Sequence, residues 1–251
     1  YIKKLTLNAT GTLLLSASHD RTAKLWSLND NKLKQTLIGH TDVVVDCTFH
    51  PVNPRIIATA SLDKDVRLWD STTGLTLDRL EHTKRLSGLA YNKNGTVLAT
   101  ITLAPSTHNP GTARLYPLVH DPNTMKIMPY KVKELDNDEY IRIPNYHYKH
   151  LYSVAFNQDG SLAVGGYSIT IYNNISVKTQ EFDTNGNKNI KYRTYIDSVV
   201  RNREIRTGYI FGCRRIIFNN KGNICATYGR SNQSNPNAYK LIVRLRKTDL
   251  K

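Results

Sequence analysis

The chain has 251 residues, 39% of them hydrophobic, and its 35 Lys and Arg against 20 Asp and Glu give a formal net charge of +15. No run reaches the roughly 18 consecutive apolar residues of a membrane span and no signal-peptide pattern is present, so we expect no membrane insertion and an intracellular location, nuclear by a small margin over cytoplasmic. The positive charge favours acidic partners, either nucleic-acid phosphates or segments rich in Asp and Glu.

Two segments near the start of the chain repeat each other. Residues 13–26 (LLLSASHDRTAKLW) recur as residues 56–69 (IIATASLDKDVRLW), with the Asp and the Trp displaced by 43 positions in both cases. A period of about 40 to 45 residues is typical of four-stranded propeller blades.

The second copy adds flanking residues that complete a known pattern. Gly39-His40 precede it and Asp70 follows Trp69 directly, so the order is Gly-His, Ser-x-Asp and Trp-Asp. This order resembles the WD40-repeat signature, in which a His, a Ser or Thr, an Asp and a Trp form a buried hydrogen-bonded chain. A buried Asp and imidazole need such partners. The resemblance implies a structural tetrad of His40, Ser61, Asp63 and Trp69, and its counterparts Ser18, Asp20 and Trp26 in the first copy.

Three weaker copies follow, each with an apolar strand, a polar turn ending in Gly and a second strand. The turns are at 91–95, 156–160 and 218–222, and Tyr116 and Tyr172 stand where the earlier copies have Trp. The runs are short, rich in β-branched residues and bounded by turn residues, which favours strands over helices.

The chain as a whole is therefore predicted to be all-β. The resemblance, strong over 11–116, implies a single WD40 β-propeller over 1–251 with about five visible blades, each a four-stranded antiparallel sheet. Because five blades close less commonly than seven in this family, membership of a seven-bladed ring stays open.

The spacing between the turn glycines exceeds the repeat length in two places. Gly95 to Gly160 is 65 residues and Gly160 to Gly222 is 62, and both exceed one blade. The excess lies near 117–148 and 173–208, which are polar and basic. Insertions between blades, extra strands and residues omitted from the chain all remain open.

A stretch of cations interleaved with tyrosines runs from 188 to 215. Arg and Lys beside aromatic residues suit phosphate pairing with base stacking, and they equally suit carboxylates of an acidic peptide. A solvated surface is the third interpretation. The residues predicted to bind a partner are Lys188, Lys191, Arg193, Arg201, Arg203, Arg206, Arg214 and Arg215.

A looser resemblance concerns residues 162–172 and 189–194, which are similar to a middle blade of the WD40 propellers shared by mRNA export and the spindle checkpoint. Members of that branch hold a Glu-rich peptide on a basic face. Lys191 and Arg193 would lie in the matching motif.

Nothing in the sequence indicates catalysis or a bound metal or cofactor. No nucleophile elbow, Gly-rich phosphate loop or Cys and His cluster accompanies the tetrad, so we expect no catalytic residue, no metal site and no cofactor. WD40 propellers serve overwhelmingly as interaction platforms. The leading hypothesis is thus a non-enzymatic scaffold within a larger complex that docks acidic protein segments. The alternative is an RNA-binding subunit of a ribonucleoprotein.

Overall fold

The computed structural model describes residues 1–106, 110–120, 127–129, 133–135, 150–166, 168–182, 191–206, 213–219, 222–228 and 241–245. These ranges contain strands and turns but no helix, and the strands form five antiparallel sheets. The prediction of an all-β fold is confirmed. It follows that no helix in the described ranges could cross a membrane.

The first two sheets each have four strands in chain order. The first sheet consists of β1 (Ile2–Leu7), β2 (Leu13–Ser18), β3 (Ala23–Ser27) and β4 (Lys32–Leu37). The second consists of β5 (Val44–Phe49), β6 (Ile56–Ser61), β7 (Asp65–Asp70) and β8 (Thr76–Glu81).

The third sheet has a divided outer edge. Its strands are β9 (Leu86–Tyr91), β10 (Val97–Thr102), β11 (Ala113–His120), β12 (Ile127–Pro129) and β13 (Lys133–Leu135). Both β12 and β13 pair with β11, at its end and at its start respectively. Part of the stretch 117–148 therefore supplies edge strands to this sheet.

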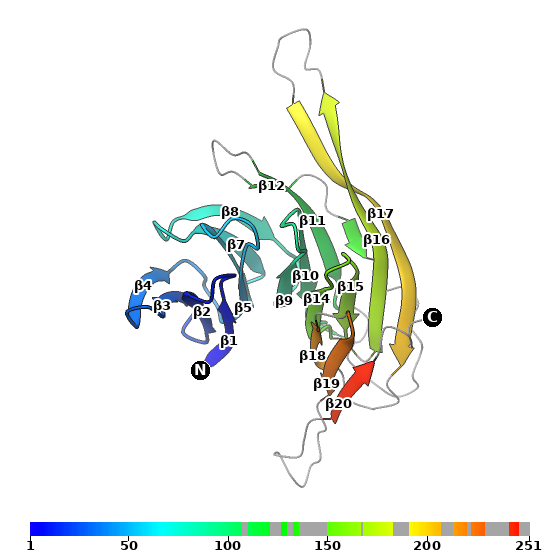
Figure 1. Cartoon of the computed structure of the whole chain (residues 1–251), viewed down its shortest axis with the longest axis horizontal. Helices are drawn as coiled ribbons and strands as arrows, with labels where there is room; N and C mark the ends of the chain where they lie inside the picture. The colour runs from blue at the N-terminus through cyan, green and yellow to red at the C-terminus, as the bar shows by residue number, and fades with distance from the viewer. Residues whose placement is uncertain are drawn as a thin grey trace.

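The fourth sheet carries the longest strands. It contains β14 (Ser153–Phe156), β15 (Leu162–Gly165), β16 (Ser168–Phe182) and β17 (Lys191–Arg206). Most of the stretch 173–208 is thus paired strand, which favours the second of the three interpretations. The outer half of the β16–β17 pair extends beyond the other sheets (Figure 1).

The fifth sheet has three strands among the described residues, where four are expected from the repeat. They are β18 (Cys213–Phe218), β19 (Ile224–Tyr228) and β20 (Leu241–Leu245).

A recurrent turn joins the first and second strands of the sheets. The side-chain oxygen of Asn8 accepts a hydrogen bond from the N–H of Leu13 (2.9 Å), and Asn92 binds Val97 N–H in the same way (3.0 Å). Gly95 takes a positive φ of 71° there, which glycine adopts without steric cost. The Asn-x-x-Gly pattern therefore ends one strand and starts the next.

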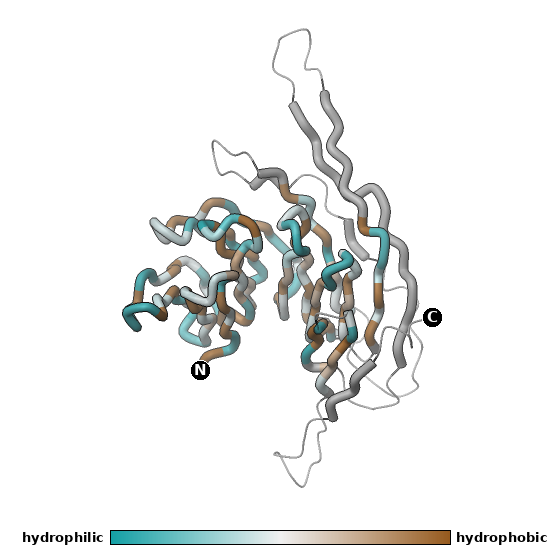
Figure 2. Tube along the Cα trace, viewed as in Figure 1, coloured by the Kyte–Doolittle hydropathy of each residue, from teal (hydrophilic) through white to brown (hydrophobic). Residues whose placement is uncertain are grey.

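The five sheets are arranged in series around their first strands. β1 contacts β5, β5 contacts β9, β9 contacts β14 and β14 contacts β18. Outer strands such as β4, β8 and β17 lie at the periphery (Figure 1). Apolar side chains fill the space between neighbouring sheets in four clusters. Hydrophobic residues accordingly follow the strands, and the turn between β3 and β4 is hydrophilic (Figure 2).

One face of the first sheet differs from its counterpart in the second. Cys47 and Phe49 of β5 are 0% and 7% exposed because they pack against the first sheet. The matching residues of β1, Leu5 and Leu7, are both 53% exposed. The described residues thus leave this apolar face of the first sheet uncovered.

Candidate functional site

A buried chain of hydrogen bonds runs through the second sheet. The indole N–H of Trp69 donates to Thr59 Oγ1 at 2.8 Å, and this hydroxyl lies 2.7 Å from His40 Nε2. His40 Nδ1 lies 2.7 Å from Asp63 Oδ2. A neutral imidazole with its proton on Nδ1 satisfies every step, because Nε2 then accepts from the Thr59 hydroxyl.

Asp63 ends this chain in a cage of donors. Burial alone would raise the pKa of its carboxyl, but hydrogen bonds from His40 and from the N–H groups of Thr41 and Asp65 lower the pKa to about 2. The carboxylate therefore stays ionised and fixes the loop before β5 to the turn after β6.

The expected role of Ser61 is corrected by this geometry. Its hydroxyl donates to the carbonyl of Asp42 (3.0 Å) and accepts from the N–H of Asp63 (3.1 Å). The hydroxyl between His40 and Trp69 belongs to Thr59, two residues earlier on the same strand. Ser61 supports the turn and does not join the chain.

In the first sheet too, the hydroxyl that binds the Trp is two residues before the expected one. Trp26 donates to Ser16 Oγ at 3.0 Å, whereas Ser18 accepts from the N–H of Asp20 at 3.2 Å. Asp20 is exposed and accepts from the hydroxyl of Thr22 (2.7 Å), which lowers the pKa of its carboxyl. The structure thus does not join Ser18, Asp20 and Trp26 into one chain.

The third sheet contains a related cluster that the sequence analysis missed. Buried His82 directs Nδ1 to the carbonyl of Leu80 (3.1 Å). Its Nε2 lies 2.9 Å from Thr100 Oγ1 and 3.0 Å from the hydroxyl of Tyr116. The available signal was His82-Thr83, which repeats His40-Thr41. Tyr116 does take the place of the Trp, as its position in the repeat suggested.

These clusters are structural in chemical terms. His40, Thr59 and Trp69 are 7%, 0% and 1% exposed, so no substrate reaches their polar atoms. In the second sheet each donor also has its own acceptor, Thr59 for Trp69, His40 for Thr59 and Asp63 for His40. The arrangement stabilises the sheets and offers no free nucleophile or base.

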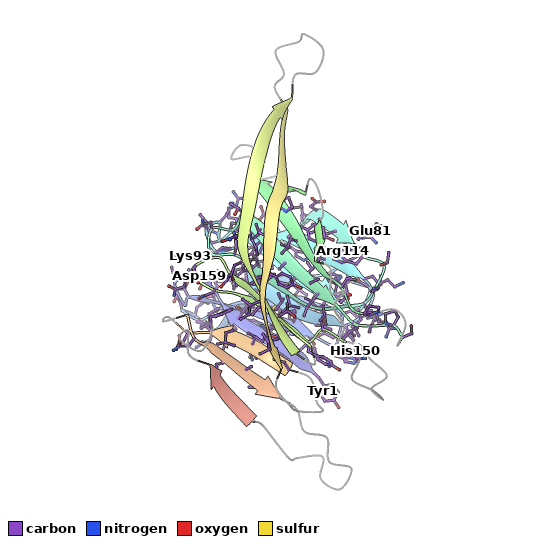
Figure 3. The ribbon with its side chains drawn as sticks, turned by 90° about the vertical axis from the view of Figure 1, so that its right-hand side faces the viewer. Tyr1, Glu81, Lys93, Arg114, His150 and Asp159 are labelled. Carbon is purple, nitrogen blue, oxygen red and sulfur yellow. The ribbon has the colours of Figure 1, made fainter. Side chains whose placement is uncertain are left out.

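The first strands of all five sheets line an open cavity of about 520 Å³. Its charged lining consists of Lys3, Lys4, Asp46 and Arg215. Residues near the starts of first strands lie on the side of the molecule that carries Tyr1 and His150, and the turns with Lys93 and Asp159 lie on the other side (Figure 3). The charged end of the cavity, lined by residues near the starts of first strands, therefore lies on the Tyr1 side.

Side chains at equivalent positions of the first strands bind residues of the next sheet. Lys4 pairs with Asp46 at 3.3 Å, and Asp46 accepts from the N–H of Leu89 at 3.1 Å. In the fourth sheet Ser153 accepts from the N–H of Ile216 at 2.8 Å. Burial raises the pKa of the Asp46 carboxyl despite the opposing effects of Lys4 and the two N–H groups it accepts from. These contacts hold successive sheets in a fixed order around the cavity.

The cavity keeps an excess of positive charge. Asp46 is already paired with Lys4 and is 13% exposed at its side chain. Lys3 and Arg215 are exposed, and within the part of the chain that the structure describes neither has a carboxylate within 4 Å. The chemistry that fits this end of the cavity is an anionic group.

The predicted basic residues do not form one patch. Lys191 and Arg193 lie in the outer half of β17, and Arg201, Arg203 and Arg206 lie in its inner half. Arg214 and Arg215 are on β18, and Lys188 is outside the described residues. Register places Arg201 opposite Tyr172 and Arg203 opposite Ile171. Among the side chains that the structure describes, Arg215 is the member of the set that lines the cavity.

Comparison with known families identifies the first two sheets. The family model "WD domain, G-beta repeat" matches residues 1–27 and 31–70, which span β1 to β7. The chain therefore contains WD40 repeats. The two matched repeats include the Trp26 and Trp69 bonds described above and correspond to the first two sheets. The other three sheets have the same antiparallel order of strands along the chain, and we call each of the five a blade.

Several curated WD40 proteins are similar to this chain over about a hundred residues. THO complex subunit 3 of Arabidopsis thaliana is 35% identical over 102 residues, which is 39% of this chain and 32% of the relative. Coronin-7 of Bos taurus is 32% identical over 96 residues (35% and 10%). Nuclear distribution protein PAC1 of Komagataella phaffii is 31% identical over 87 residues (33% and 17%). The chain spans at most about a third of the length of these relatives.

The WD40 repeats indicate a general class of function. WD40 repeats generally serve as scaffolds for protein–protein interaction and not as enzymes. Within the residues that the structure describes, no group of three or more His, Cys, Asp or Glu is placed to hold a metal ion.

Proposed function

We propose that this chain is a non-enzymatic WD40 scaffold that docks an acidic protein segment at the Tyr1-side mouth of its cavity. The observation that carries the proposal is the pair of cations, Lys3 and Arg215, which line the cavity without a carboxylate partner among the described residues. They come from the first and the fifth blade, so the site depends on the assembled blades.

Electrostatics supports an anionic ligand there. A concave site with low-dielectric walls strengthens the field of the charges that line it. Arg215 can bind a carboxylate through two parallel N–H donors, and Lys3 adds a second charge. An acidic segment that enters the mouth would thus find cationic partners on both the first and the fifth blade.

Rigidity supports the role of a platform. The bonds from Lys4 to Asp46, from Asp46 to Leu89 N–H and from Ser153 to Ile216 N–H fix the lining before a partner arrives. A preorganised site loses less conformational entropy on binding than a flexible one. A single propeller domain over 1–251 is part of the proposal.

The setting we propose is a multi-subunit complex inside the cell, with the nucleus favoured. THO complex subunit 3, one of the similar proteins, is by its name a subunit of a complex. The free thiols of Cys47, Cys213 and Cys225 suit a reducing compartment.

A binding assay with a Glu-rich peptide of about 12 residues tests the proposal. The fluorescence anisotropy of the labelled peptide is followed against protein concentration at about 50 and 150 mM salt. Arg215→Glu and Lys3→Glu should each weaken binding about tenfold or more, because a carboxylate then faces the peptide.

The matched control is Lys93→Glu, which makes the same charge change at an exposed turn on the opposite side of the molecule (Figure 3). It should change the affinity by less than about threefold, since screening limits charge effects across the molecule. Equal losses from Arg215→Glu and Lys93→Glu, or no loss from either, would exclude the cavity mouth as the docking site.

A further inference from the structure

The outer half of the β16–β17 pair forms a two-stranded ribbon. Residues 177–182 of β16 pair with residues 191–196 of β17 without a bulge, and the three register shifts of this pair all lie closer to the sheet. The ribbon stands clear of the other strands in two perpendicular views (Figures 1 and 3). We name this segment the blade-four ribbon.

Backbone register assigns each ribbon residue to one of two faces. Residues directly opposite each other in an antiparallel pair share a face, and so do residues two apart on one strand. One face therefore carries Lys178, Gln180, Phe182, Lys191, Arg193 and Tyr195. The other carries Val177, Thr179, Glu181, Tyr192, Thr194 and Ile196.

The two faces differ sharply in charge. The first has three cations and no carboxylate, and it also has two aromatic residues. The second has one carboxylate and no cation. We name the first the cationic face.

We propose that the cationic face of the blade-four ribbon binds single-stranded nucleic acid. Lys178, Lys191 and Arg193 would neutralise phosphates, and Phe182 and Tyr195 would stack on bases. This goes beyond the proposed function, because the ribbon is a surface separate from the cavity and serves a different class of partner.

The aromatic residues favour nucleic acid over an acidic peptide. Carboxylates would engage the three cations but would leave Phe182 and Tyr195 without a matching group, whereas every base presents a π-face. They also favour a single strand over a duplex, since paired bases are already stacked on their neighbours and the major groove of A-form RNA is too narrow for side chains to read.

The shape of the ribbon is consistent with such a role. Cross-strand partners lie roughly 5 Å apart, and register places Phe182 opposite Lys191 and Tyr195 opposite Lys178, so each aromatic residue has a cation beside it. A two-stranded ribbon outside a sheet is marginally stable in water by itself. A bound strand would stabilise it by covering the aromatic residues.

Titration of a fluorescently labelled 20-nucleotide oligouridylate with the whole chain tests the proposal, with oligodeoxythymidylate of the same length in parallel. Two double variants are compared. One combines Lys191→Gln and Arg193→Gln on the cationic face, and the other combines Thr179→Glu and Thr194→Glu on the opposite face. Both double variants lower the net charge by two, so only the face differs.

The cationic-face variant should lose about tenfold in affinity at 100 mM salt, and the slope of log K against log salt should fall by about 1.4, that is 0.7 for each lost phosphate contact. The opposite-face variant should lose less than about threefold and keep the slope. Tyr195→Ala should weaken binding about fivefold or more and Tyr192→Ala less than twofold. Preference for the ribose or the deoxyribose polymer tells RNA from DNA as the source of the strand.

Three results would overturn the proposal. They are the absence of binding by the unmodified chain at 50 mM salt, equal losses from the variants on the two faces, and binding of a Glu-rich peptide to this face in place of the oligonucleotide. Arg215→Glu should leave oligonucleotide binding intact, and the ribbon variants should leave peptide binding at the cavity intact. Failure of one proposal is thus distinguishable from failure of the other.

Discussion

Trp69 donates its indole N–H to Thr59 Oγ1 at 2.8 Å, and Thr59 is completely buried. This hydroxyl serves both Trp69 and His40, so its loss leaves two polar atoms without a partner in a dry environment. Thr59→Val keeps the shape of the side chain and removes only the hydroxyl. The free energy of unfolding should fall by about 2 to 3 kcal/mol, because unpaired buried polar groups carry their full desolvation cost.

Ser61→Ala is the control on the same strand. It removes the bonds to the Asp42 carbonyl and from the Asp63 N–H at the edge of the cluster, so about 1 kcal/mol should be lost. Urea unfolding of the two variants measures both values. A larger loss from Ser61→Ala than from Thr59→Val would return the central role to Ser61.

The sequence could not choose between these two hydroxyls. The 43-residue offset that relates Ser18 to Ser61 also relates Ser16 to Thr59, and alternate residues of a strand share a face. The register decides, since β6 places Ile57 opposite Trp69 and Thr59 opposite Arg67. The repeat thus predicted the blade and its Trp, but it could not tell which of two hydroxyls, two residues apart on the same face of the strand, binds the Trp.

The lowered pKa of Asp63 predicts that part of the folding stability of the chain is lost in acid. Its pKa in the folded chain is about 2 and its ordinary value is 3.8, so the contribution is fully present above about pH 4 and is lost as the pH falls toward 2. The shift corresponds to about 2 kcal/mol. Urea unfolding between pH 2 and 7 should show that Asp63→Asn flattens this part of the pH profile. An unchanged profile in the variant would mean that other carboxyls account for acid unfolding.

Gly95 and Gly160 form a second matched pair. Both have positive φ, 71° and 84°, in equivalent turns, but a Cβ on Gly95 would collide with the His50 ring whereas nothing lies within 4 Å of one on Gly160. His50 Nε2 also donates to the Gly95 carbonyl at 3.0 Å, which ties the second blade to the third. Gly160→Ala should cost about 1 kcal/mol for the left-handed backbone.

Gly95→Ala should cost about 3 kcal/mol, since it adds displacement of His50 to the same backbone penalty. Thermal unfolding of the two variants provides the comparison. Equal shifts in Tm would show that the His50 contact contributes little.

The extended strands of the fourth blade were the least predictable part of the fold. Residues 173–208 are polar and basic, and without an alternating apolar pattern they carry little signal for strands. Pairing between β16 and β17 supplies the order instead, and in the blade-four ribbon it places the cations on one face and Glu181 on the other. The predicted basic set was consequently divided among the ribbon, the inner half of β17 and the start of β18, because chain proximity says little about which side of a sheet a residue occupies.

Phe49 and Leu7 occupy the same position on the first strands of successive blades, opposite Ile57 and Leu14 respectively. Phe49 is 7% exposed against the first blade and Leu7 is 53% exposed. Phe49→Ala should cost about 3 to 5 kcal/mol through lost burial and a cavity, whereas Leu7→Ala should cost less than about 1 kcal/mol. Urea unfolding of this chain measures both. A cost for Leu7→Ala close to that of Phe49→Ala would mean that the apolar face of the first blade is covered in solution, and the exposed surface of this blade would then have to be reassigned as an interface.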